Sequence, residues 1–114
     1  MEQFLRVMKS LSDGNRVKIL KMLQERSLCA CEIQAALGIS EPTALGHIED
    51  LEEAGLVTSR KEGQWVNYYP ADGSSSPYAA MMLASLQQWL TDDAEISDLM
   101  TVLRFIHRDN IRKG

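Results

Sequence analysis

Apolar residues recur with helical spacing from the first residues of the chain. Phe4 and Met8 begin a series at i, i+4 and i+7, which predicts an amphipathic N-terminal helix. A polar break follows, where either Ser12 or Asp13 can cap a second helix. In that second helix the apolar spacing continues to about residue 26. The pattern therefore predicts two helices before the first cysteine.

Two shorter helical patterns follow in the arrangement of a helix-turn-helix motif. The first covers about residues 31–37 and ends at Gly38, a residue type that suits the position after a helix. The second begins after Ser40, a favourable N-cap, and keeps an apolar stripe until about Ala54. The spacing predicts a helix-turn-helix over about residues 31–54.

Extended runs come directly after that motif. Residues 56–61 and 64–69 flank Glu62 and Gly63, a pair that favours a hairpin turn. A hairpin placed directly after the second helix is the wing of a winged helix-turn-helix, so we expect a wing over about residues 56–69. The predicted fold class is mostly α with a small β-hairpin.

A polar, serine-rich joint separates the wing from a wide apolar stripe over about residues 77–90. Such a stripe either packs on the chain's own core or forms an interface, and obligate interfaces resemble a core cut in half. We expect a homodimer formed by the N-terminal and C-terminal helices, with interface residues Phe4, Met8, Met82, Leu83, Leu86 and Trp89. A last helix is expected over about residues 92–110, with Asp92 and Glu95 spaced as a capping box.

Length and composition limit the possible functions. The 114 residues suit one domain, over residues 1–114, and leave little room for a catalytic fold with its own cleft. The net charge of −4 argues against a nucleic-acid binder, which usually has a basic surface. No apolar run approaches the roughly 20 residues that span a bilayer, and the start of the chain lacks the apolar core of a signal peptide. We therefore expect a cytoplasmic protein, whose thiols stay reduced.

Cys29 and Cys31 are the only cysteines of the chain, and one residue separates them. Residues at i and i+2 of a regular helix point about 200° apart, so one ion can reach both sulfurs only at a helix end. We expect Cys31 at the N-cap or first helical position, with Cys29 in irregular backbone before it. A helix N-terminus lowers a thiol pKa and favours the thiolate that soft ions bind. Two alternatives are a pair of small buried apolar residues and a redox switch, which would need a strained disulfide.

These motifs together resemble the arsenical-resistance (ArsR/SmtB-type) metalloregulatory repressors. The resemblance covers almost the whole chain and rests on the segments Ser12–Leu20, Leu28–Ile33, Leu37–Val57 and Arg60–Tyr68. It implies a winged-helix homodimer that represses operator DNA and releases it when a thiophilic metalloid binds. In such repressors the paired cysteines are the arsenite ligands, which would make Cys29 and Cys31 the ligands for arsenite or antimonite as inducer. No permanent cofactor is implied.

Two departures from the family pattern concern the metalloid. Some relatives have a third cysteine three residues after the pair, where this chain has Gln34. The third ligand must then come from solvent or a small thiol, or the site prefers another thiophilic ion such as cadmium or lead. Other relatives bind metals through His and Asp on a C-terminal helix, but residues 78–90 contain no His, Asp, Glu or Cys. We reject that second kind of site.

The predicted recognition helix is acidic and contains no Lys or Arg. Glu49 and Asp50 are expected near the DNA backbone, which predicts weak or salt-sensitive binding. Lysines and arginines outside the motif, including Arg16 and Lys21, are additional candidates for phosphate contacts. The predicted DNA contacts are Ser40, Thr43, Leu45 and His47 in the motif, with Arg60 and Lys61 in the wing.

The leading interpretation is a metalloid-responsive transcriptional repressor. A winged-helix interaction module that has lost DNA binding is the alternative that the acidic helix favours. A sensor of another thiophilic metal, or of thiol redox state, is a further one. A thiol enzyme is disfavoured because Cys29 and Cys31 have no histidine near them in the sequence.

Overall fold

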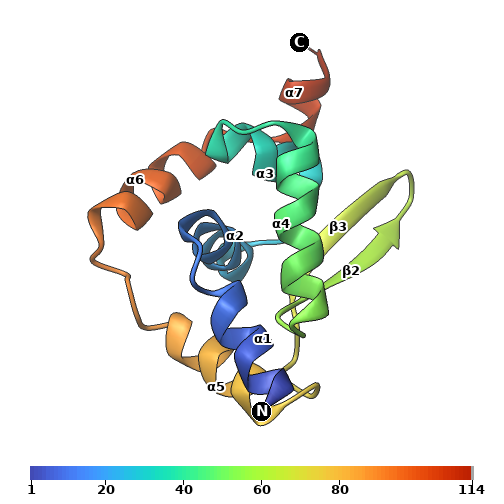
Figure 1. Ribbon diagram of the computed structural model, residues 1–114. Coiled ribbons are helices and arrows are strands. Elements are labelled where there is room, and N and C mark those ends of the chain that lie inside the picture. The colour runs from blue at the N-terminus through green and yellow to red at the C-terminus, as the bar shows by residue number, and fades with distance from the viewer. Residues whose placement is uncertain (114) are drawn as a thin grey trace.

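The computed structural model describes residues 1–113 and has a winged helix-turn-helix fold, as predicted (Figure 1). Its helices are α1 (Glu2–Ser10), α2 (Gly14–Glu25), α3 (Ala30–Leu37), α4 (Glu41–Glu53), α5 (Pro77–Leu86), α6 (Ala94–Leu103) and α7 (Arg108–Lys113). Its strands are β1 (Leu28–Cys29), β2 (Val57–Glu62) and β3 (Trp65–Pro70). The hairpin of β2 and β3 projects from the body of the molecule beside α4.

Side-chain caps explain where the helices begin. Asp13, rather than Ser12, caps α2. Its carboxylate accepts hydrogen bonds from the backbone N–H groups of Asn15 and Arg16, at 2.8 and 3.2 Å. Ser40 caps α4 through Thr43 N, as the sequence predicts. α6 is capped by Asp93, one residue after the predicted Asp92. These local signals place the starts to within one residue.

The hydrophobic core surrounds α2, which lies at the centre of the molecule (Figure 1). Residues 19–23 of α2, more than one full turn, are all buried, and Ile19, Leu20 and Met22 are fully inaccessible. The helix-turn-helix contributes Ile33 from α3 and Ile48 from α4. The two helices of the motif are therefore held against a common apolar support, which fixes their relative position.

The sheet has three strands rather than the two that the sequence predicts. β1 pairs antiparallel with β3, giving the strand order β1-β3-β2, and Cys29 lies opposite Asn67. β1 has only two residues and therefore has no alternation that could reveal it. The hairpin turn lies between Glu62 and Trp65, with Gly63 at a positive φ of 66°. The sheet thus connects the first cysteine directly to the wing.

The helix expected over residues 77–90 ends earlier, at Leu86. Beyond it the backbone changes to tighter bonds from residue i to i−3, and Leu90 adopts a positive φ of 66°. The buried Lys21 of α2 donates through Nζ to the carbonyl oxygens of Leu86 and Trp89, at 2.5 and 2.9 Å. A cation from the centre of the molecule therefore terminates α5.

The helix expected over residues 92–110 is two helices, α6 and α7. The interruption has a similar cause, because Arg26 donates through Nη2 to the carbonyl oxygens of Leu103 and Ile106, at 3.4 and 2.6 Å. α6 ends at these bonded carbonyl groups, and α7 starts in a new direction near α3 (Figure 1).

The part of the chain that the structure describes contains no helix long and apolar enough to cross a membrane.

The predicted interface residues divide into three groups by their burial. Leu83 and Leu86 are buried in the chain's own core, so their assignment to a surface was wrong: the apolar stripe of α5 faces α1 and α2. Met8 and Met82 are half-buried against the same core. Phe4 and Trp89 are accessible, with exposed fractions of 38% and 56%.

Candidate thiol site and nucleic-acid interface

The two cysteines meet at the start of α3. Cys29 ends β1 and occupies the N-cap position, and Cys31 is the second residue of the helix. The helix therefore begins one or two residues earlier than expected. Because Cys29 is outside the regular helix, the two sulfur atoms lie on the same side, 2.8 Å apart. This is the convergence that a regular helix would prevent.

Burial changes the chemistry of the first thiol. Cys29 is 3% exposed, and loss of hydration raises its pKa to about 12, aided by the contact with the Cys31 sulfur and by the nearby Glu32 carboxylate. The lowered pKa expected from a helix N-terminus was therefore wrong for Cys29. Cys31 is half-buried. In the free protein Cys29 is a protonated thiol at neutral pH, and a ligand must displace its proton.

Glu32 organises the backbone around the cysteines. Its carboxylate is buried and accepts a hydrogen bond from Cys29 N–H at 3.0 Å, which is one half of a capping box. It also accepts from Arg26 Nη1 at 3.3 Å. The sequence marks Glu32 as a first-turn acid, but its burial and its bond to Arg26 depend on the tertiary fold.

The chain offers two protein ligands here. Among the described residues no group of three or more His, Cys, Asp or Glu side chains is placed to hold a metal ion. Gln34 lies three residues after Cys31 on α3, hence on the same face of that helix. The donor set is therefore two sulfurs, which suit a thiophilic ion that takes its remaining ligand from elsewhere.

The N-terminal half of α4 presents its small polar side chains to solvent. Ser40 and Thr43 are exposed and joined by a hydrogen bond of 2.8 Å between their hydroxyl groups. Leu45 is 40% exposed. His47 is half-buried, with Nδ1 3.4 Å from Arg16 Nη1. Three of the four predicted contacts on this helix are thus open, and the fourth is held by an arginine.

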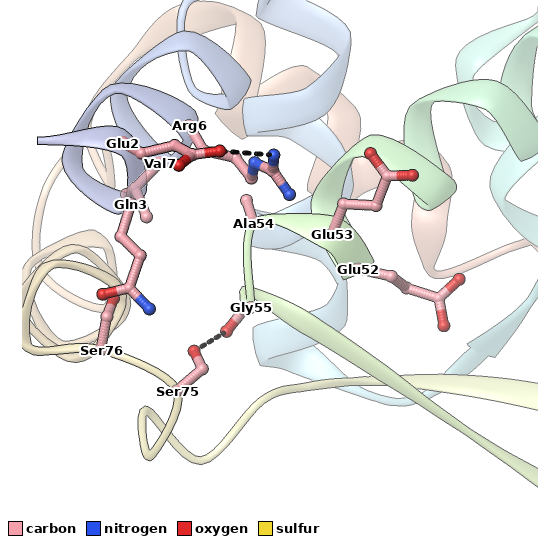
Figure 2. Close-up of a pocket in the computed structure, with 10 residues that line it drawn as sticks. All are labelled: Glu2, Gln3, Arg6, Val7, Glu52, Glu53, Ala54, Gly55, Ser75 and Ser76. Atoms are coloured by element: carbon pink, nitrogen blue, oxygen red, sulfur yellow. Dashed lines mark hydrogen bonds and ion pairs between the residues drawn. The ribbon is translucent and has the colours of Figure 1, made fainter.

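The acidic charge of α4 is less of an obstacle than the sequence suggests. Asp50 forms an ion pair with Arg16, 3.2 Å between Oδ2 and Nη1, so it is neutralised by the protein itself. Glu52 and Glu53 line a pocket of about 310 Å³ with residues of α1 and of the joint before α5 (Figure 2). At about 1.5 Å per residue, Glu52 lies roughly 13 Å along α4 from Thr43.

The basic residues that the sequence offers as phosphate contacts differ in how accessible they are. Arg60 and Lys61 are exposed on β2, and the Arg60 guanidinium lies 4.4 Å from the centroid of the Tyr69 ring. Arg16 and Lys21, by contrast, were wrong as phosphate contacts. Arg16 donates to carbonyl oxygens at the end of α1, and the distance from its Nε to the carbonyl oxygen of Ser10 is 2.7 Å. Lys21 is buried. Of these four basic residues, Arg60 and Lys61 are the two that are exposed.

The sequence of this chain is similar to those of known bacterial regulators. Residues 13–59 match the family described as "Bacterial regulatory protein, arsR family". An arsenic resistance transcriptional regulator of Pseudomonas putida is 37% identical over 93 residues, which cover 77% of this chain and 72% of that protein. The arsenical resistance operon repressor of Escherichia coli is 38% identical over 65 residues, or 56% of each chain.

A solved structure supports the same assignment. The homodimeric winged helix-turn-helix DNA-binding domain of a possible ArsR-family transcriptional regulator from Mycobacterium bovis is 30% identical. It aligns with a TM-score of 0.63 over 75% of this chain and 76% of that domain. Both comparisons place the chain among transcriptional regulators. The chain belongs to the arsR family of bacterial regulatory proteins.

Proposed function

We propose that this protein is a transcriptional repressor that releases its operator when arsenite or antimonite binds Cys29 and Cys31. The observation that carries the proposal is the pair of sulfurs 2.8 Å apart at the start of the first helix of the DNA-binding motif. The relatives from Pseudomonas putida and Escherichia coli are an arsenic resistance regulator and an arsenical resistance operon repressor, which supports the choice of an arsenical as inducer.

The chemistry of arsenous acid suits a pair of cysteine thiols. Each thiol proton combines with one hydroxide of As(OH)₃ and leaves as water, while an As–S bond replaces the As–O bond. Two such exchanges give one arsenic atom bound by Cys29 and Cys31 with its third hydroxide retained. The hydroxide then occupies the position that a cysteine at residue 34 would fill, and no third thiolate is required.

The DNA-binding side of the proposal uses α4 and the wing. The exposed side chains of Thr43 and Leu45 enter the major groove, where the Leu45 side chain contacts thymine methyl groups. Ser40 and His47 flank them, and the wing supplies positive charge for the phosphates through Arg60 and Lys61, both of which are exposed.

The operator is bound by a homodimer. α1 and α5 carry accessible apolar side chains that lie side by side, with the rings of Phe4 and Tyr78 in edge contact at 5.4 Å. Leu5 and Met81 are further accessible apolar residues of α1 and α5, with exposed fractions of 54% and 62%. We define these four residues as the α1–α5 surface. A second copy covers this surface, and the homodimeric state of the Mycobacterium bovis domain supports a dimer.

A gel-shift titration of the protein's own promoter region tests the proposal. The wild type should shift the DNA at low salt and release it on addition of arsenite. Cys29→Ser and Cys31→Ser should bind the DNA with wild-type affinity and fail to release it, because each variant loses one of the two protein ligands. Absence of any low-salt shift would exclude a repressor and favour the interaction module.

Two further variants make the test specific to the thiols. Ala30→Ser changes the residue between the cysteines without removing a sulfur, so it should release DNA as the wild type does. Gln34→Cys adds a thiol on the same face of α3 as Cys31, and it should lower the arsenite concentration needed for release. Normal release by both cysteine variants would show that the inducer binds elsewhere.

A further inference from the structure

Arg108 connects the thiol site to the wing. It is the first residue of α7, which lies close to α3 (Figure 1). Its backbone N–H donates to Glu32 Oε2 at 3.2 Å, and its side-chain Nη1 donates to Asn67 Oδ1 at 3.0 Å. A single residue thus bonds the carboxylate that caps the cysteine helix and a side chain of β3.

The contact with the wing is broader than one hydrogen bond. The guanidinium carbon of Arg108 lies 4.6 Å from the centroid of the Trp65 ring, in the geometry of a cation–π interaction. Trp65 is the first residue of β3. Asn67, two residues later, lies opposite Cys29 in the sheet. Arg108 therefore holds the strand that pairs with the first cysteine.

From Asn67 the hydrogen bonds continue to the strand with the exposed basic residues. Asn67 Nδ2 donates to Glu62 Oε1 at 2.8 Å, and the Tyr69 hydroxyl donates to the same oxygen at 2.5 Å. The Tyr69 ring in turn carries the guanidinium of Arg60. These contacts form a continuous series, Glu32–Arg108–Asn67–Glu62–Tyr69–Arg60, from the cysteine helix to the proposed phosphate contacts.

Ligation of the two sulfurs would disturb the first member of the series. An ion bound by both sulfurs replaces the direct contact that they make here, so ligation moves the two sulfurs relative to each other. Cys29 N–H is bonded to the same carboxylate that accepts from Arg108 N–H. A displacement of Cys29 therefore disturbs the carboxylate to which Arg108 N–H is also bonded.

We propose that Arg108 is a positioning residue that transmits ligation at Cys29 and Cys31 to the wing, through Glu32 on one side and Asn67 and Trp65 on the other. The inference rests on the proposed function and adds the route of regulation. Ligation weakens the Glu32–Arg108 bond, Arg108 shifts on Trp65 and Asn67, and the wing loses the orientation in which Arg60 and Lys61 meet DNA.

The first measurement is the DNA affinity of Arg108→Gln with and without arsenite. Coupling between two binding sites typically amounts to about 5- to 150-fold in affinity. Without arsenite the variant should already bind DNA more weakly than the wild type, because the wing loses the contacts that orient it, and arsenite should lower its affinity little further. Arg104→Gln, which removes an exposed arginine four residues earlier, should retain the full decrease.

The second measurement requires no DNA and separates coupling from general destabilisation. In a Trp89→Phe background Trp65 is the only tryptophan, and arsenite should shift its emission in that protein. The shift should disappear in Arg108→Gln and be partly restored in Arg108→Lys, which keeps the charge but not the planar group. Direct titration should show that Arg108→Gln still binds arsenite.

The outcomes are distinguishable. If the wild type binds no arsenite or releases no DNA, the proposed function fails, whatever Arg108 does. If the wild type releases DNA and Arg108→Gln releases it equally, with an unchanged Trp65 response, the repressor stands and the role of Arg108 is refuted. Loss of release without loss of arsenite binding supports the inference.

Discussion

Replacement of Lys21 by methionine tests how the tertiary structure uses a charge that the sequence assigns to the surface. The Lys21 ammonium is buried and donates to the carbonyl oxygens of Leu86 and Trp89. Methionine has a similar length and no donor, so Lys21→Met removes both bonds without leaving a cavity. The bond to Leu86 is buried, and the bond to Trp89 is partly buried, so water can replace the second more readily than the first.

The expected loss follows from those two bonds. A hydrogen bond from a charged donor contributes about 1.5–3 kcal/mol, and a buried carbonyl left without a donor costs about 1–3 kcal/mol. The variant is relieved of the cost of burying an ammonium group, which amounts to several kcal/mol before relaxation and offsets part of the loss. We expect a decrease of about 2 kcal/mol in the free energy of unfolding.

The assay is urea unfolding at one protein concentration, since dimerisation contributes to apparent stability. Lys18→Met is the matched control, because Lys18 lies on the same helix and its ion pair with Glu95 is long, at 3.9 Å, and open to solvent. That variant should lose no more than about 0.5 kcal/mol.

DNA binding gives a second comparison. A lysine that neutralises a phosphate contributes about 0.9 to the slope of log affinity against log salt concentration. Lys21→Met should leave the slope unchanged. If Lys21→Met destabilises no more than Lys18→Met, or lowers the salt slope by about one, the buried capping role is refuted.

Two other predictions concern Cys29 and the α1–α5 surface. The fold raises the pKa of Cys29 from 9.0 to about 12, so the unfolded chain loses this proton at a lower pH than the folded protein does. The contribution of the protonated thiol to the free energy of unfolding is therefore complete below pH 9 and is lost as the pH rises toward 12. Urea unfolding between about pH 9 and pH 11 should show the wild type losing roughly 1.4 kcal/mol more per pH unit than Cys29→Ala, and parallel curves would contradict the buried thiol. Met81→Glu should give folded monomers by light scattering, whereas Leu86→Glu should unfold the chain because Leu86 is buried; a Met81→Glu dimer would exclude α5 from the interface.

Much of the fold could be predicted because its signals are local. Ser40 caps α4 through a residue three positions later, and the spacing of apolar residues in the helix-turn-helix follows from one helical turn. The wing was visible in two extended runs around a turn with Gly63. Such signals involve neighbours within a few residues, so they can be recognised without knowing what packs on the element.

The thiol site could be predicted only in part. The spacing of Cys29 and Cys31 required a helix end between them, and the structure places the start of α3 there. The pKa direction failed, because the helix terminus is a local effect whereas burial under the sheet and core is not. The same holds for Asp50, whose partner Arg16 lies 34 residues away.

The sequence by itself determined the winged helix-turn-helix, its family and the presence of a thiol pair at a helix start. The tertiary structure decided where the helices end and what the charged residues do. Lys21 terminates α5 from 65 residues away, and Arg26 terminates α6 from 77 and 80 residues away. Helix starts carry their own capping side chains, whereas these helix ends depend on cations brought by folding, and no local pattern encodes such a partner.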